Sequence, residues 1–183
     1  MSSSSVSPNE TSTKRTVERS RCVKNEIVLP NDTNNLGNLM GGRLLHWMDI
    51  CAAISAQRHT QRVAVTAAVD NVEFHSAIRQ GEIVTLRSQV NRAYRTSMEV
   101  EINVWAENAI TREFRKCNRA FYTFVGVDGN GRPVRVDPVH PETDEERERY
   151  ETAAKRRELR LVLAGRMSWD EAKLIREDFL SRT

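Results

Sequence analysis

The sequence predicts an α+β domain in which an antiparallel sheet of five or six strands packs against one long apolar helix. Residues 41–59 indicate the helix, because apolar side chains run over helical length there without strand-like alternation, so most faces must be buried. Later segments indicate the sheet, because polar and apolar residues alternate in them with period two. Such alternation is typical of antiparallel strands that pack one face on a core.

Length and composition limit the class of protein. The chain has 183 residues, of which 39% are hydrophobic, and this is enough for one domain with a core. Its 28 basic and 25 acidic residues are interleaved, so the net charge of +3 indicates a solvated surface, and we expect no nucleic-acid partner. No apolar run approaches the roughly 20 residues that cross a bilayer, and the N-terminus has no signal-peptide core. We therefore expect a cytoplasmic protein without membrane insertion.

The three cysteines favour the same compartment. Cys22, Cys51 and Cys117 stand far apart, and two of them lie in apolar or alternating segments. This pattern suits buried thiols in a reducing cytosol better than a disulfide framework.

The chain divides into three parts. Residues 1–20 are polar and rich in Ser and Thr, with almost nothing to bury, and are expected to form a disordered N-terminal arm. Residues 21–137 hold the sheet and the apolar helix. Residues 138–183 are expected to be a charged helical C-terminal extension, used for packing or subunit contact. Within it, Ser168 and Glu171 have the spacing of a capping box, which predicts a second helix start.

The central part begins with a strand, a loop and the helix. The strand covers residues 22–29 and ends at Pro30. The stretch NDTNNLGNLMGG, residues 31–42, is rich in Asn, Asp and Gly, which is typical of a loop that leads into a helix start near Gly41. The helix is expected to end at about His59.

The remaining strands follow the helix. They are expected within residues 62–74, 82–94, 97–108 and 117–127, and the last ends in the turn DGNGRP. In the third of these segments, Glu99, Glu101 and Asn103 alternate with apolar residues. We expect these polar residues to face solvent while their neighbours face the core.

Phosphate and metal motifs are missing from the sequence. GNLMGGR lacks the Lys-Ser/Thr that completes a P-loop. DGNGRP begins like a calcium loop, but Val139 stands where a bidentate Glu is needed. The four histidines and three cysteines show no close ligand spacing. We expect no metal and no other cofactor.

Asp49 lies in the middle of the apolar stretch LLHWMDICAAISA, residues 44–56. A carboxylate that loses its hydration must be paired, neutralised or used. One interpretation is a structural carboxylate paired with His46 one turn earlier. The other is a catalytic acid, which the pair Gly41 and Gly42 favours, because unpaired N–H groups and the helix dipole at a helix start can bind an oxyanion.

The spacing of Gly42 and Asp49 bears on the assembly. Seven residues place them on nearly the same helical face, but a rise of about 1.5 Å per residue separates them by roughly 10 Å along the axis. One substrate carbonyl cannot touch both within a single subunit. A catalytic role therefore predicts a dimer with two shared sites.

Four motifs resemble those of the hotdog-fold acyl-CoA thioesterases, in particular their acyl-CoA hydrolase branch. They are PNDTNNLGNLMGGRLLHWMDICAAISAQRH, VTAAVDNVEFHSAIRQGEIVTLRSQV, YRTSMEVEINVWAEN and AFYTFVGVDGNGRP, in the order of the family. The resemblance covers about residues 22–137. It implies a hotdog fold, in which an antiparallel sheet wraps around one long central helix. It also implies hydrolysis of an acyl-CoA thioester to free acid and coenzyme A, without a metal, in an assembly that is typically a trimer of dimers.

The resemblance also implies residue roles. The catalytic acid of the family falls on Asp49, as general base or as nucleophile, and the asparagine that assists it falls on Asn34 of the partner subunit. The oxyanion donor falls on the backbone N–H near Gly42. The positions implied to contact the coenzyme A part of the substrate are Val65, Thr66, Arg95, Thr96, Ser97, Arg58 and His59. For the last two, a cation facing the helix dipole and a phosphate contact are equal alternatives.

Departures from the family leave alternatives open. Tyr94 stands where relatives usually have Gly and is expected to alter the coenzyme A groove, whereas Ala77 replaces a common Pro and affects turn stiffness more than chemistry. A second hypothesis is an acyl-CoA-binding sensor or scaffold that has lost catalysis. A third, a hotdog dehydratase, needs a catalytic His, for which His46 is the only candidate on the helix.

Overall fold

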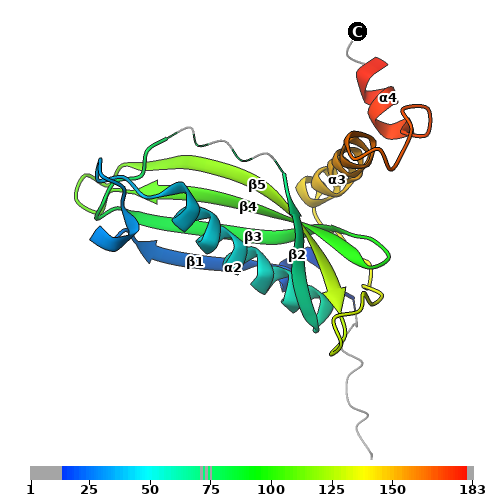
Figure 1. Ribbon diagram of the computed structural model, residues 1–183, viewed down its shortest axis with the longest axis horizontal. Coiled ribbons are helices and arrows are strands. Elements are labelled where there is room, and N and C mark those ends of the chain that lie inside the picture. Colours follow the sequence, from blue (N-terminus) through cyan, green and yellow to red (C-terminus); the bar gives the residue numbers. More distant parts are fainter. Residues whose placement is uncertain (1–13, 71, 73, 75, 181–183) are drawn as a thin grey trace, which may run out of the picture.

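The computed structural model describes residues 14–180 apart from residues 71, 73 and 75 (Figure 1). The helices are α1 (Val17–Ser20), α2 (Gly41–Thr60), α3 (Asp144–Leu163) and α4 (Lys173–Leu180), and a 3-10 helix covers Pro30–Asp32. The strands are β1 (Cys22–Ile27), β2 (Val63–Val69), β3 (Ile83–Ala93), β4 (Ser97–Glu107) and β5 (Phe114–Val127).

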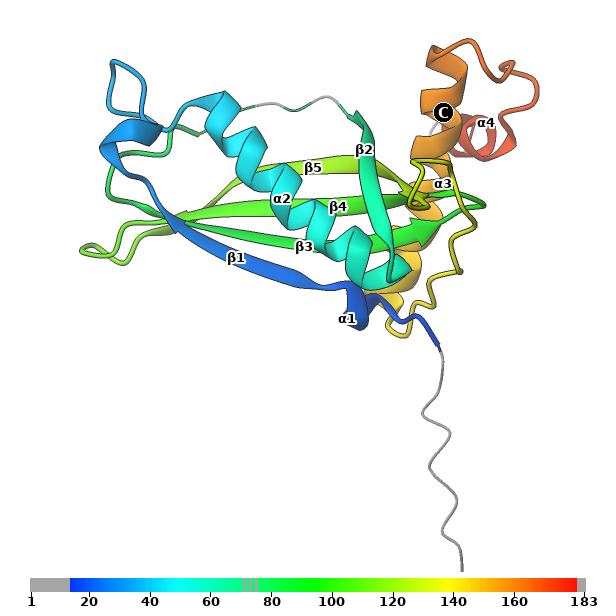
Figure 2. The ribbon, with the colours of Figure 1, turned by 60° about the horizontal axis from the view of Figure 1, so that its bottom comes forward.

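The five strands form one antiparallel sheet in the order β1-β3-β4-β5-β2. The sheet curls around α2, which lies along its inner side (Figure 1, Figure 2). In the chain α2 follows β1 and precedes β2, and these strands lie at opposite edges of the sheet. The helix therefore carries the chain from one edge to the other. This arrangement confirms the expected α+β hotdog fold, with a sheet wrapped around one central helix.

The end of α2 determines where β2 begins. Gln61 follows the helix in the left-handed conformation, with φ at 54°, and its N–H donates to the Gln57 carbonyl at 2.7 Å. A left-handed residue at this position ends a helix and redirects the chain. As a result β2 starts two residues later and runs back beside the helix face that carries Asp49.

α3 packs on the side of the sheet opposite α2, near the turn that joins β3 to β4 (Figure 2). The Tyr94 hydroxyl donates to the Ala153 carbonyl at 3.1 Å, and the Arg92 guanidinium donates to the Tyr150 carbonyl at 3.1 Å. These bonds attach the charged extension to the sheet by its backbone as well as by its side chains.

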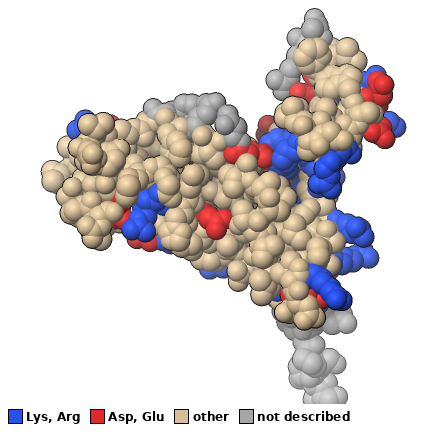
Figure 3. Space-filling view, viewed as in Figure 1, with Lys and Arg blue, Asp and Glu red and all other residues tan. Residues whose placement is uncertain are grey.

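The polar face of β4 is buried, so the expectation that Glu99, Glu101 and Asn103 face solvent is wrong. Their exposed fractions are 0%, 1% and 9%. The reason is that α3 covers this face with arginines. Arg156 donates to both oxygens of Glu99, most closely at 2.7 Å, and Arg160 donates to it at 3.0 Å. Figure 3 shows basic side chains gathered where α3 leaves the body of the molecule.

Glu101 is held by a similar set of donors. It accepts from the amides of Asn91 and Asn103 at 3.0 and 2.8 Å and pairs with Arg119 at 2.9 Å. Burial raises the pKa of this carboxyl, but the two amides and the charges of Arg119 and Arg149 outweigh it and hold the pKa below its usual value. Glu101 therefore stays ionised although it lies inside the protein.

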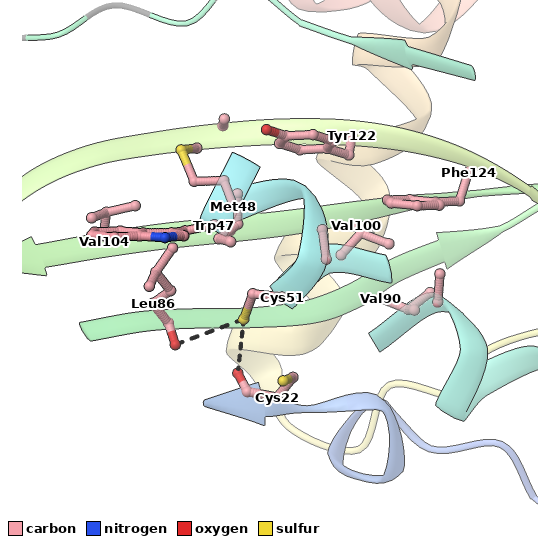
Figure 4. Close-up of a cluster of buried hydrophobic side chains, with 14 of the residues drawn as sticks. Cys22, Trp47, Met48, Cys51, Leu86, Val90, Val100, Val104, Tyr122 and Phe124 are labelled. Atoms are coloured by element: carbon pink, nitrogen blue, oxygen red, sulfur yellow. Dashed lines mark hydrogen bonds between the residues drawn. The ribbon is translucent and has the colours of Figure 1, made fainter. Parts of the chain in front are cut away.

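The core lies between α2 and the inner face of the sheet (Figure 4). Met48 and Cys51 of α2 and Leu86 and Phe124 of the sheet are all fully buried. The Cys51 thiol lies 3.8 Å from the Leu86 carbonyl, and burial raises its pKa to about 12, so it remains protonated. All three cysteines are free and buried, as the sequence predicts.

Residues 17–20 differ from the expected disordered arm of residues 1–20. They form α1, in which Val17 is 1% exposed and Ser20 accepts a hydrogen bond from the Val90 N–H at 2.9 Å. Val17 joins the hydrophobic core, and together with the Ser20 hydrogen bond it holds this turn against α2 and β3. Residues 1–13 of the arm lie outside the described residues.

The extension contains two helices, as predicted. Thr143 caps α3 through a reciprocal bond pair with Glu146. Ser168 and Glu171 also form the predicted reciprocal bonds, at 3.3 and 2.8 Å, but these close a turn that precedes α4. Within the described residues, no helix has both the length and the apolar character that crossing a bilayer requires.

Candidate active site

A pocket of about 500 Å³ opens between α2 and the end of β2. One face of α2 supplies four residues to it, at positions i, i+3, i+4 and i+7 of the helix: Gly42, Leu45, His46 and Asp49. This confirms that Gly42 and Asp49 share a helical face. The other wall comes from the end of β2 and the segment after it, and from Tyr122 of β5.

Asp49 has a hydrogen-bonding partner on β2. The Thr66 hydroxyl donates to Asp49 Oδ1 at 2.6 Å. Thr66 faces the helix because it lies two residues after the buried Ala64, and alternate residues of a strand share a face. The register of β2 against β5 shifts between Thr66 and Ala68. Such bulges redirect side chains and are frequent beside active sites.

The contact with Thr66 differs from the pairing of Asp49 with His46 that the structural interpretation expected. Within the described part of the chain, the hydrogen bond to Asp49 comes from Thr66 and not from His46, which is exposed. The carboxylate is only partly buried and borders an open pocket. Among the described residues, Thr66 donates to Asp49 Oδ1, and no hydrogen bond engages Oδ2.

The start of α2 leaves its backbone donors accessible. Met40 at the N-cap makes no side-chain capping bond. A Cβ atom placed at Gly42 would have nothing within 4 Å, whereas one placed at Gly41 would meet the Phe74 ring at 3.3 Å. Gly42 thus borders free space at the positive end of the helix dipole, a setting that favours a negatively charged or polarised oxygen.

Tyr122 is a site residue that sequence reasoning missed. Its side chain is 1% exposed and lines the same pocket as Asp49. Burial, and then the Asp49 charge, raise the pKa of its phenol to about 12, so it stays protonated and can only be a neutral donor or acceptor. An aromatic residue in an alternating strand reads as core, so the sequence carried no signal that its hydroxyl borders a pocket.

Asn34 lies apart from this pocket. It is exposed in the loop before α2, and its Oδ1 accepts from the N–H groups of Leu36 and Asn38 at 2.9 and 3.2 Å. This geometry is an Asx turn. The described residues that line the pocket of the same protomer do not include Asn34.

Arg95, Thr96 and Ser97 line a second, larger pocket of about 1000 Å³. The end of β2 and the C-terminal half of α3 complete it, and Val69 and Asp70 border both pockets. The two pockets are therefore neighbours along β2. Val65 and Thr66 precede this shared border; Val65 is 45% exposed at the edge of the sheet.

Arg58 and His59 occupy different surroundings from the other predicted contacts. His59 is 2% exposed, its Nε2 lies 2.9 Å from the Asp137 carbonyl, and burial lowers its pKa. The exposed Arg58 donates to the Arg21 carbonyl. The described linings of both pockets lack them, and a buried neutral imidazole is not placed to contact a phosphate.

Among the described residues, no three His, Cys, Asp or Glu side chains come together in a way that could hold a metal ion. The first pocket is lined by the carboxylates of Asp49 and Asp70, the imidazole of His46, the phenol of Tyr122 and the start of α2 at Gly42. The Thr66 hydroxyl joins them through its hydrogen bond to Asp49. These groups can activate water or attack a carbonyl, and they can stabilise the oxyanion that results.

Comparisons with known proteins agree with this chemistry. A family model of the thioesterase superfamily matches residues 36–111. An uncharacterized acyl-CoA thioester hydrolase of Bacillus subtilis is 43% identical over 147 residues, which make up 80% of this chain and 86% of that protein. The chain spans 23–26% of the length of three longer rodent relatives.

Solved structures show the same relationship. The crystal structure of an apo-hexameric acyl-CoA thioesterase superposes with a TM-score of 0.79 at 42% identity, covering 81% of this chain and 96% of that one. An acyl-CoA hydrolase from Staphylococcus aureus, solved with butyryl coenzyme A, coenzyme A and coenzyme A disulfide, gives 0.74 at 33% identity, covering 82% and 93%.

The Staphylococcus aureus enzyme has also been solved as three alanine variants, which replace an asparagine, an aspartate and a threonine. In that enzyme the asparagine precedes the aspartate by 15 residues, and the threonine follows the aspartate by 17.

Proposed function

We propose that this chain hydrolyses fatty acyl-CoA to free carboxylic acid and coenzyme A. The premise is that it belongs to the hotdog-fold acyl-CoA thioester hydrolases of the thioesterase superfamily. The enzyme class follows from relatives that share most of their length with it. The observation that carries the residue assignment is the hydrogen bond between Thr66 and Asp49 at the border of an open pocket.

Asp49 is the proposed catalytic acid. Thr66 occupies Oδ1 and fixes the carboxylate, so Oδ2 is available for the reaction. As a general base, Asp49 takes a proton from water while the water oxygen bonds to the thioester carbon; the C–S bond then breaks and the thiolate of coenzyme A takes up the proton. As a nucleophile, Asp49 displaces the thiolate itself, and water then hydrolyses the acyl-aspartyl anhydride.

Gly42 is the proposed oxyanion donor, through its backbone N–H. It lies on the same helical face as Asp49, about two turns or roughly 10 Å along the axis. One carbonyl therefore reaches Asp49 of one protomer and Gly42 of another. This distance supports a site shared between subunits, with at least a dimer as the active form.

Asn34 is proposed to act from the partner subunit. Its Oδ1 is engaged in the Asx turn, so its NH₂ group is the available donor, and it can orient the attacking water. The spacing of the three side chains supports the assignment. Asn34 precedes Asp49 by 15 residues and Thr66 follows it by 17, as do the residues replaced in the Staphylococcus aureus variants.

The edge strand β2 is the surface that a second copy would meet. It ends the sheet, and Val63, Val65 and Val69 are 58%, 45% and 42% exposed along it. An open edge with apolar side chains favours pairing with another chain. A hexameric relative supports a trimer of such dimers, and we propose this assembly.

The test is thiol release from short, medium and long acyl-CoA esters by the wild type, Asp49→Asn and Asp170→Asn. Asp170 is 93% exposed in its side chain and serves as the matched control. We expect Asp49→Asn to lower kcat by about a thousandfold, because the loss of a general base or nucleophile raises the activation barrier. Asp170→Asn should leave kcat unchanged.

Two outcomes would contradict the proposal. Wild-type protein that releases no thiol from any ester is not a thioesterase, and an Asp49→Asn enzyme with wild-type kcat removes Asp49 from the mechanism. Mass spectrometry of acid-quenched enzyme separates the two mechanisms, because an acyl adduct on the protein forms only when Asp49 attacks the carbonyl.

A further inference from the structure

The C-terminal extension forms one wall of the larger pocket, although its sequence suggested only packing or subunit contact. The pocket lies between α3 and the turn that contains Tyr94 and Arg95. Its other border, Val69 and Asp70, is shared with the pocket that holds Asp49. A molecule that extends from Asp49 past Val69 and Asp70 enters the pocket beside α3.

This pocket carries an excess of positive charge. Among the described residues that line it, Asp70 is the one acid, and it already pairs with Arg160 at 2.8 Å. The arginines that line it are Arg95, Arg156, Arg157, Arg160 and Arg166. The concentration of basic side chains beside α3 is visible in Figure 3.

The arginines fall into two groups by their partners. Arg156 and Arg160 are bound to the buried Glu99 and serve to attach α3 to the sheet. In the part of the chain that the structure describes, no carboxylate pairs with Arg95, Arg157 or Arg166. The last three therefore have guanidinium groups available for an anion.

The side chains that line the pocket beside these arginines include apolar and aromatic ones. Leu159 and Leu163 of α3 line it and are 46% and 78% exposed, so they present uncovered apolar surface to a ligand. Arg157 lies over the Tyr94 ring, 4.2 Å from its centroid. A ligand that matches such a wall carries phosphates for the guanidinium groups and a flat, partly apolar body for the leucines.

We infer that α3 and the turn after it recognise the phosphorylated nucleotide end of the substrate. Arg157 of α3 and Arg166 of the turn join Arg95 on the phosphates of coenzyme A, and Leu159 and Leu163 lie against its adenosine. This inference rests on the proposed function, because it takes an acyl-CoA as the substrate. It makes the extension a specificity element, which selects coenzyme A thioesters over phosphate-free thioesters of pantetheine.

Binding of coenzyme A tests the inference without depending on turnover. Calorimetric titrations compare coenzyme A with pantetheine on the wild type, Arg157→Gln, Arg166→Gln and the double variant. We expect the double variant to raise the Kd of coenzyme A by about tenfold, equivalent to roughly 1.4 kcal/mol, and to leave that of pantetheine within about twofold. KM values for acyl-CoA and acyl-pantetheine should follow the same pattern with kcat unchanged.

Arg147→Gln is the matched control. Arg147 is also on α3, its side chain is 52% exposed, and its partner Asp144 is on the same helix, away from the pocket. We expect this variant to bind coenzyme A as the wild type does. Arg166 is exposed, so the single variant Arg166→Gln still tests the inference if Arg157→Gln fails to fold.

Coenzyme A binding that is equal in the wild type and the double variant would overturn the inference and leave the thioesterase intact. A double variant with unchanged coenzyme A binding but a smaller assembly in sedimentation would also overturn it, by showing that a second copy occupies this wall. Failure of the wild type to hydrolyse any acyl-CoA is a different result, which removes the proposed function.

Discussion

At the scale of single residues, Gly42 combines a helical position with open space. Its φ is not among the left-handed values, and the missing Cβ leaves the pocket free beside the backbone N–H. The helix alone would prefer alanine here. A glycine that the local structure does not require indicates that something else must come close to the backbone.

We therefore expect Gly42→Ala to have opposite effects on stability and activity. The free energy of unfolding should rise by about 0.4–1 kcal/mol, because alanine restricts the unfolded chain. The value of kcat/KM should fall by about a hundredfold, because the methyl group stands where the oxyanion approaches its donor. Thermal unfolding and thiol release measure the two effects. Gly129→Ala, in a remote turn with equal free space, should leave kcat/KM unchanged, and normal activity of Gly42→Ala would exclude its N–H as the oxyanion donor.

Glu82 provides a pH-dependent contribution to stability. It is 6% exposed, and Arg115 donates to both its oxygens at 2.8 Å. These bonds outweigh burial, and with the Arg79 N–H they hold the pKa of Glu82 below its usual 4.5. Because the folded pKa is depressed, the stabilisation is complete above pH 4.5 and disappears as the pH falls through the folded pKa.

The substitution Glu82→Gln should therefore lower stability by about 2 kcal/mol at neutral pH, since hydrogen bonds between charged groups are lost. The difference from the wild type should shrink as the pH falls below 4.5 and through the lowered folded pKa, because the native side chain then becomes protonated. A series of thermal unfolding experiments from neutral to acidic pH checks this, and a difference that stays constant with pH would show that the charge of Glu82 is not the cause.

At the scale of elements, the sequence predicted which segments form strands better than it predicted what packs on those strands. Period-two alternation identified β4 and placed its apolar residues on the core, and α2 began at the predicted Gly41. The same alternation cannot say what covers the polar face. The sequence pattern predicts that Glu99 is exposed, because the covering residue, Arg156 of α3, stands 57 residues later in the chain.

The candidate site shows the same limit. The spacing of Gly42 and Asp49 along one helix was sufficient to place both in one pocket. The partnership of Asp49 with Thr66 depends on how β2 returns beside α2, which no local pattern contains, and the position of Tyr122 depends on β5 as well. Contacts between elements that are distant in the chain therefore account for what sequence reasoning missed.

The ion pairs under α3 predict the energetics of this element. Glu99 is fully buried, so its charge needs Arg156 and Arg160. Removal of one side of a buried ion pair leaves an uncompensated charge, whereas replacement of the whole set by apolar residues is often neutral. We expect Arg156→Met with Arg160→Met to lower the free energy of unfolding by about 3–5 kcal/mol, and the further change Glu99→Met to restore most of it.

Urea unfolding at fixed protein concentration measures this series, because assembly makes stability depend on concentration. Glu99→Met alone serves as the reference, since its arginines are about one-fifth exposed and can reach water. A triple variant no more stable than the arginine double variant would show that the arginines stabilise α3 by packing and not by compensating Glu99.

At the scale of the whole molecule, one chain does not bring together all the groups that the proposed reaction uses. Asp49 and Gly42 are too far apart for one carbonyl, Asn34 lies outside the pocket of its own protomer, and β2 is an open edge. A second copy placed against β2 accounts for all three observations. The proposed dimer is thus a consequence of where one hotdog puts its functional groups.

A shared site predicts that two inactive variants complement each other. In a dimer of Asp49→Asn with Asn34→Ala, one site combines the intact Asp49 of one subunit with the intact Asn34 of the other, and the second site contains both defects. Random assembly makes half of the dimers mixed, so co-expressed variants should recover about a quarter of the wild-type activity per site. Each variant purified alone should have little activity.

If Asp49 and Asn34 instead acted within one subunit, every site in the mixture would carry one defect, and the activity of co-expressed chains would not exceed the average of the two parents. Thiol release by tagged, isolated heterodimers distinguishes these outcomes, because their composition is fixed before the activity is measured.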